Sequence, residues 1–330
     1  MNLDNSAIKQ SSPVLSSGSR GRTGLWWGLL GVAAFSLTVP LTRVAVAGLN
    51  PVFVGSGRAV VAAVLAIAAL ALTRQRLPHG VQWARLGLVA AGIVVGFPML
   101  TSLALAEMPA ARAAVVIGLL PAATAVVTVW RTGERPSLGF WVSAGLGGAA
   151  AVVFALLQGG APGGAAGLEW PDLLLFGAVL LAALGYAEGG LLARELGAWQ
   201  TVSWALAVAL PVMLAITLTA VPLAVGVVGW QQWAAFGYLA VVSMFLGFFA
   251  WYRGLAQGPM ATVSQVQLVQ PVLSIVWAAL LLGEVITLPV ALGGLAVILC
   301  AGFAVRSRLR GGRTAIASRG RLGARGRIRH

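Results

Sequence analysis

Leu105–Glu134 reads LAEMPAARAAVVIGLLPAATAVVTVWRTGE, and 150 residues later Leu255–Glu284 reads LAQGPMATVSQVQLVQPVLSIVWAALLLGE. At this one offset, and without a gap, several residues recur. They include Leu105, Ala106, Pro109, Pro121, Val126, Gly133 and Glu134, which fall on Leu255, Ala256, Pro259, Pro271, Val276, Gly283 and Glu284. Each copy is an apolar run of bilayer length, with a proline before it, a second proline in its middle and Gly-Glu after it. The repeat predicts two related halves.

The composition is that of an integral membrane protein. Hydrophobic residues make up 59% of the 330 residues and charged residues only 9%, against roughly 25% charged in a soluble domain. Apolar spans occupy nearly the whole chain, so there is no room for a soluble catalytic domain. The single cysteine, Cys300, excludes an internal disulfide.

Windows of about 20 apolar residues between charged or Gly/Pro breaks predict an all-α protein with ten transmembrane helices. In the first half they cover 24–46, 51–73, 86–105, 110–130 and 137–157. In the second half they cover 171–193, 199–222, 231–252, 260–282 and 286–305. Ten spans place both termini on the same side of the membrane.

The positions of the basic residues predict which side this is. With the N-terminus inside, 19 of the 22 basic residues fall in inside segments, where short loops carry the Lys/Arg excess. The exceptions are Arg43, Arg58 and Arg112. We therefore expect a multi-pass protein of the bacterial inner (plasma) membrane with both termini cytoplasmic.

Five spans in each half, an odd number, require the second half to enter the membrane from the opposite side. The prediction is therefore two inverted five-helix repeats, an arrangement in which secondary transporters place a substrate site near mid-bilayer. The predicted segments are a disordered cytoplasmic leader (1–22), the first repeat (23–157), a Gly-rich external linker (158–170), the second repeat (171–305) and a basic tail (306–330).

The doubled segment resembles the drug/metabolite transporter superfamily, in particular its bacterial ten-helix branch of two EamA-type repeats. The resemblance rests on the two proline and Gly-Glu sets and on Arg58, early in the second span. It implies export of small metabolites by alternating access. Within this branch, the amino-acid exporters of the YddG type are the most similar in size and repeat layout.

Prolines within the spans predict bends. Pro121 and Pro271 lie mid-helix, where proline frees a backbone carbonyl. At equivalent places of inverted halves they are candidate gating pivots, together with Pro40 and Pro98. A fixed structural kink is the alternative for each.

The ninth span is the most polar. On a helix, Ser264, Gln267, Gln270 and Ser274 fall on one face. The matching residues of the fourth span are mostly apolar, so the fold does not require this polarity. We predict that the face contacts substrate, and the alternative is hydrogen bonding between helices.

Ionisable and polar side chains within other spans are further candidates. Arg58 could bind a substrate carboxylate, and Glu188 could accept a coupling proton, whereas snorkelling to the interface is the alternative for both. The other candidates for the substrate cavity are Ser36, Thr38, Tyr186, Trp204 and Tyr238.

Enzymatic functions are disfavoured. The histidines are His79, in a predicted loop, and His330, and the aspartates are Asp4 and Asp172. These residues provide no zinc site, aspartyl pair or Ser-His pair within the bilayer. The sequence has no P-loop motif either. We expect no enzymatic activity, no cofactor and no bound metal.

The predicted function is export of amino acids or similar small polar metabolites. The alternatives are export of drugs or other amphiphiles and, in a different class, a non-transporting membrane scaffold or sensor. Nine arginines between Arg306 and Arg329 lack interleaved aromatic residues. We therefore expect the tail to lie near anionic lipids of the cytoplasmic leaflet and to bind no nucleic acid.

Overall fold

The computed structural model describes residues 17–133, 137–158, 168–221, 228–257, 266–303 and 306. Every regular element in these residues is helical. Eight helices are long and apolar enough to cross a membrane, and the helices Val269–Leu282 and Leu288–Phe303 are apolar but shorter. Each of the ten predicted spans thus coincides with an apolar helix among the described residues, which confirms the all-α membrane fold.

Most spans of the first half consist of more than one helical segment. These segments are α1 (Ser17–Ser36), α2 (Thr38–Val46), α3 (Pro51–Leu72), α4 (Val81–Val89), the π-helical η1 (Ala90–Gly96), α5 (Phe97–Glu107), α6 (Ala110–Ile117), α7 (Leu120–Thr132) and α8 (Leu138–Gln158). The first, third and fourth spans are therefore α1–α2, α4–η1–α5 and α6–α7.

The second half repeats this pattern in part, because its first span is one continuous helix whereas its third and fourth spans are interrupted like those of the first half. Its segments are α9 (Trp170–Glu195), α10 (Ala198–Ala220), α11 (Trp230–Tyr238), the π-helical η3 (Leu239–Leu246), α12 (Gly247–Gln257), α14 (Val269–Leu282) and the helix Leu288–Phe303. The π-helical segment recurs at the same place in the third and eighth spans. A π segment within a helix is rare and is often found at functional sites, so its recurrence supports the two-repeat architecture.

The fourth and ninth spans are interrupted at equivalent places. A turn at 118–119 separates α6 from α7, and a turn at 267–268 precedes α14. Pro121 and Pro271 lie in the first turn of the segments that follow, where proline is tolerated. Both spans end at a left-handed glycine, Gly133 with φ 68° and Gly283 with φ 66°, a conformation that costs other residues free energy. The matching prolines and glycines of the sequence thus mark matching backbone features.

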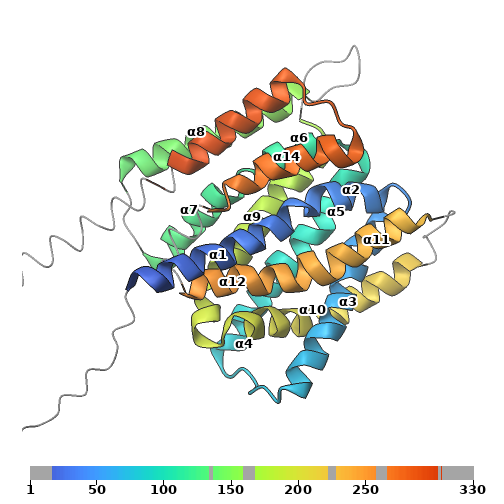
Figure 1. The fold of residues 1–330 in the computed structure, drawn as a ribbon, viewed down its shortest axis with the longest axis vertical. Coiled ribbons are helices and arrows are strands. Elements are labelled where there is room, and N and C mark those ends of the chain that lie inside the picture. Colours follow the sequence, from blue (N-terminus) through green and yellow to red (C-terminus); the bar gives the residue numbers. More distant parts are fainter. Residues whose placement is uncertain are drawn as a thin grey trace, which may run out of the picture.

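The halves pack against each other with the same pairs in both directions. α1 packs along α12, and α5, the repeat equivalent of α12, packs along α9, which is equivalent to the first span. Likewise α14 packs on α1, and its equivalent α7 packs on α9. The helices α3 and α10 pack on each other. In Figure 1, α8 and the red helix Leu288–Phe303 lie together along one edge of the bundle. This pattern is that of a pseudo-twofold axis through the centre.

The third and eighth spans are longer than predicted, at Val81–Glu107 and Trp230–Gln257. The window count stopped short of the charged residues Arg85, Glu107 and Arg253, but the helices include them. η1 packs closely on α9, because a Cβ on Gly92 would lie 2.4 Å from the carbonyl oxygen of Leu181.

Candidate substrate site

A cavity lies at the centre of the bundle and is lined from both halves. Its free volume is about 20 Å³, which is room for about one water molecule, so the site is nearly closed in this structure and has to open to admit a substrate. Its lining residues are Phe35, Thr38, Val39, Arg58, Ile93, Phe97, Pro98, Tyr186, Ser243, Met244, Phe248 and Gln270. The wall is mainly apolar and aromatic, with a few polar groups, as is typical of ligand sites.

A second, smaller cavity of about 10 Å³ lies where the fourth and ninth spans cross, and Gln270 lines both cavities. It is lined by Ile117, Leu120, Pro121, Gln267, Gln270, Pro271 and Ser274. The first three residues are the repeat equivalents of Gln267, Gln270 and Pro271. The two copies of the helix break therefore face each other at the pseudo-twofold axis. The side chains of the first copy are apolar, and those of the second are mostly polar.

The predicted polar face of the ninth span is buried in protein. Gln267 is 1% exposed, Gln270 6% and Ser274 2%. Among the described residues, both amide atoms of Gln267 and the Oε1 atom of Gln270 have no hydrogen-bond partner. Buried amides without partners are costly, and such a cost is typical of groups that bind a ligand or water. Ser264 lies outside the described residues.

The break in the first span supplies further polar groups. α1 ends at Ser36 and α2 begins at Thr38. The Thr38 hydroxyl hydrogen-bonds that of Ser243, at 2.7 Å, and both residues line the central cavity. Ser36 instead joins the first span to the ninth: its carbonyl accepts from the Ser274 hydroxyl at 2.8 Å, and its hydroxyl accepts from Trp277 Nε1 at 3.1 Å.

The structure does not bring all the predicted site residues together. Tyr186 and Pro98 line the central cavity, and Pro121 and Pro271 line the second one. Pro40 is in the first turn of α2 and is buried. Two candidates, Tyr238 and Trp204, line neither cavity. Tyr238 donates to the carbonyl of Ala34 at 3.2 Å, and Trp204 packs edge-on against Trp83 with ring centroids 5.8 Å apart.

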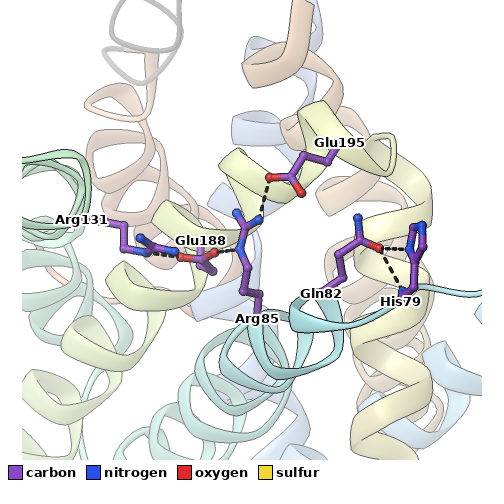
Figure 2. A network of polar contacts seen from close by, with 6 residues as sticks. All are labelled: His79, Gln82, Arg85, Arg131, Glu188 and Glu195. Carbon is purple, nitrogen blue, oxygen red and sulfur yellow. Dashed lines mark hydrogen bonds and ion pairs between the residues drawn. The ribbon is translucent and has the colours of Figure 1, made fainter.

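Glu188 lies in an ion-pair network and not at the central cavity. Figure 2 shows its carboxylate between Arg85 and Arg131; Arg131 Nε donates to Oε2 at 2.8 Å, and Arg85 Nε donates to Oε1. Arg85 also pairs with Glu195 at 2.6 Å. The network fastens α4 and α7, of the first half, to α9, of the second.

Ion pairs also join the fourth span to the sixth at their other ends. On α6, Arg112 pairs with Asp172 at 2.6 Å and with Glu169 at 3.0 Å, at the start of α9. The carboxylate of Glu284, after α14, accepts hydrogen bonds from the backbone N–H groups of Ala110 and Ala111, each at 2.8 Å. An acidic group at a helix N-terminus is favourable, so Glu284 joins the end of the ninth span to the start of the fourth.

The sequence did not predict these contacts because they join residues far apart in the chain. Glu188 is 103 residues from Arg85, and Glu284 is 174 residues from Ala110. A partial signal was present, since Arg112 was an exception to the distribution of basic residues. A basic residue inside a span indicates a nearby carboxylate.

The two halves are matching sets of apolar helices that pack against each other around a central cavity with a few polar groups. This architecture is that of secondary membrane transporters. The EamA-like transporter family model matches both halves, over residues 22–156 and 169–306. The chain therefore belongs to the EamA-like transporter family. It is a multi-pass membrane transporter of a small molecule and not an enzyme.

A relative supports this membership, and a solved structure shares the fold. The chain is 42% identical over 279 residues to the uncharacterized transporter YdeK of Bacillus subtilis (strain 168), a match that covers 84% of this chain and 96% of that protein. A crystal structure 20% identical in sequence superposes with a TM-score of 0.59 and covers 88% of this chain and 98% of the other. At this identity, the second likeness shows the fold alone.

Proposed function

We propose that this transporter exports amino acids or similar small polar metabolites by alternating access, and that the central cavity is its substrate site. The observation that carries the proposal is the set of buried polar groups without partners on Gln267 and Gln270, at the crossing of the two repeats. A zwitterion supplies both donors and acceptors for such groups. The resemblance to YddG-type exporters supports the same substrate class.

We further propose that Thr38, Ser36, Ser274 and Tyr186 shape this site, and that the helix breaks at Pro121 and Pro271 act as pivots. The two breaks face each other across one cavity, so a small rotation at either would change its shape. Pro98, in the first turn of α5 beside a π segment, and Pro40 are secondary pivots. Ser264 belongs to the same predicted face.

We propose the orientation that the sequence predicts, with the leader and the tail in the cytoplasm and the linker outside. The tail then lies near anionic lipid. It rests on the 19 of 22 basic residues in inside segments. The ends of α4 and α9 that carry Arg85 and Glu195 then face the cytoplasm. Labelling of cysteines introduced in linker and tail, in intact and in permeabilised cells, tests this orientation. Labelling of the tail in intact cells would refute it.

Uptake of a panel of labelled amino acids into proteoliposomes, with and without a pH gradient, tests the substrate proposal. We expect saturable uptake of a subset of the panel, absent from protein-free liposomes. Uptake of amphiphilic cations in place of every amino acid would instead support a drug exporter. No flux of any compound would support the scaffold or sensor alternative.

A further inference from the structure

Arg58 is a buried cation with weak partners. It lies on α3 at 2% exposure and lines the central cavity. Its guanidinium donates to two hydroxyls over long distances, Thr42 Oγ1 at 3.5 Å and Thr101 Oγ1 at 3.4 Å. Its Nε has no partner among the described residues. Neutral hydroxyls at such distances compensate little of the cost of burying a full positive charge.

The carboxylates that could neutralise Arg58 are engaged elsewhere. Within the described residues, Glu169 and Asp172 pair with Arg112, and Glu188 and Glu195 pair with Arg85. Glu284 caps α6, and Glu107 is exposed at the end of α5. The contrast with Arg112 is direct, since that arginine is also buried, at 8%, but has two carboxylates. The described part of the chain therefore leaves the charge of Arg58 uncompensated.

The surroundings of Arg58 define what could compensate it. Gln270, which lines the same cavity, has a buried Oε1 atom without a donor. Apart from the hydroxyls of Thr38, Tyr186 and Ser243, the rest of the wall is apolar, with the aromatic rings of Phe35, Phe97 and Phe248. None of the described residues lining this cavity is acidic. The cavity thus offers a fixed cation, a hydrogen-bond acceptor and an apolar surface, but no anion for a cationic ligand.

We propose that Arg58 binds an anionic group of the substrate, a carboxylate, and that Gln270 accepts a hydrogen bond from a donor on the same molecule. The inference rests on the proposed function and narrows it to small organic anions and zwitterions. A guanidinium presents paired N–H groups that match the two oxygens of a carboxylate. Cationic compounds are then poor substrates, because the buried charge of Arg58 repels them.

Thermal stability of the purified protein tests the anion site without knowledge of the natural substrate. The probes are sodium propanoate and its neutral analogue propanamide, at equal millimolar concentration and matched ionic strength. Propanoate should raise the Tm of the wild type, because it binds the folded state, whereas propanamide should not. In Arg58→Gln the propanoate response should disappear, and Arg58→Lys should keep part of it. Equal responses to both probes, or an unchanged response in Arg58→Gln, would overturn the proposal.

The Tm without ligand separates binding from a structural role. If the role of Arg58 is to bind a ligand, Arg58→Gln should melt no lower than the wild type, because the substitution removes an uncompensated buried charge. A large fall in Tm for both Arg58→Gln and Arg58→Lys would instead show that Arg58 holds the helices together. The control is Arg253→Gln on α12, whose guanidinium lies 4.7 Å from the Trp27 ring and which should keep the propanoate response.

Uptake into proteoliposomes distinguishes this inference from the proposed function. For each labelled amino acid that the wild type moves, its unlabelled amide should compete about thirty-fold less well or worse, as expected when a buried charge pair is lost. Equal competition by acid and amide, with uptake unaffected in Arg58→Gln, would refute the Arg58 site and leave amino-acid export standing. An Arg58-dependent propanoate response with no amino-acid uptake would refute amino-acid export and leave the anion site standing.

Discussion

Gln270→Leu should lower the apparent affinity for substrate about ten- to a hundred-fold. A hydrogen bond to a charged group contributes about 1.5–3 kcal/mol, and about 1.4 kcal/mol corresponds to a factor of ten. Gln270 lies on α14, is buried, and has its Oε1 atom unpartnered among the described residues. The measurement is the initial rate of uptake against substrate concentration in proteoliposomes with equal amounts of inserted protein.

The folding of the same variant provides an internal check. Leucine is similar in size to glutamine, and it removes a buried acceptor without a partner, so stability should be unchanged or slightly higher. The control is Gln257→Leu, at the exposed end of α12, which should leave uptake unchanged. Equal losses of uptake in both variants, or a marked loss of stability in Gln270→Leu, would show that this face serves helix packing.

Glu188→Gln should destabilise the protein strongly, by about 3 kcal/mol, because it leaves two guanidinium groups facing a neutral amide. Removing one partner of a buried ion pair costs about 3–5 kcal/mol, and Glu188 is 2% exposed. We expect the lower end of this free-energy range, because the side chain of Arg131 is 46% exposed and keeps contact with water. Thermal melting of the purified protein measures the loss, which should lower Tm by several degrees.

Glu195→Gln is the matched control, since Glu195 pairs with the same Arg85 but is 44% exposed. Exposed ion pairs contribute about 0–1 kcal/mol, so this variant should melt close to the wild type. A similar loss in both variants, or none in Glu188→Gln, would contradict the ion-pair account.

The coupling role predicted for Glu188 remains a proposal that the same variant tests. A proton on Glu188 would weaken its pairs with Arg85 and Arg131, and thereby loosen α4 and α7 from α9. If this is the coupling step, Glu188→Gln should retain downhill flux but lose its dependence on a pH gradient. Unchanged gradient dependence would remove Glu188 from the coupling mechanism.

The repeat was predictable because its determinants are local. A proline, an apolar run and a left-handed glycine set where a helix starts, breaks and ends, so Pro121 and Gly133 could be matched to Pro271 and Gly283 without a structure. Burial of the Gln267 face was predictable for a similar reason, since helical periodicity places polar residues on one side and lipid disfavours them.

The tertiary partners of the charged residues were not predictable, because ion pairs join distant segments. Nothing local to Glu188 indicates that Arg85 and Arg131 will meet it. Nor does a position well within a span place a side chain in the cavity. Tyr186 faces the cavity, whereas Trp204 packs on Trp83, because helix rotation is set by packing between the halves.

Accessibility of a cysteine at position 274 tests most directly whether the central crossing is the translocation path. Ser274→Cys in a Cys300→Ser background is treated with a charged, water-soluble thiol reagent from either side of the membrane. We predict slow reaction from both sides, as the site opens alternately, and slower reaction in the presence of a transported amino acid. Ser203→Cys, at a buried serine of α10 outside the cavity lining, should not react. If Ser274→Cys is equally unreactive from both sides, the crossing of the fourth and ninth spans is closed packing, and the account is wrong.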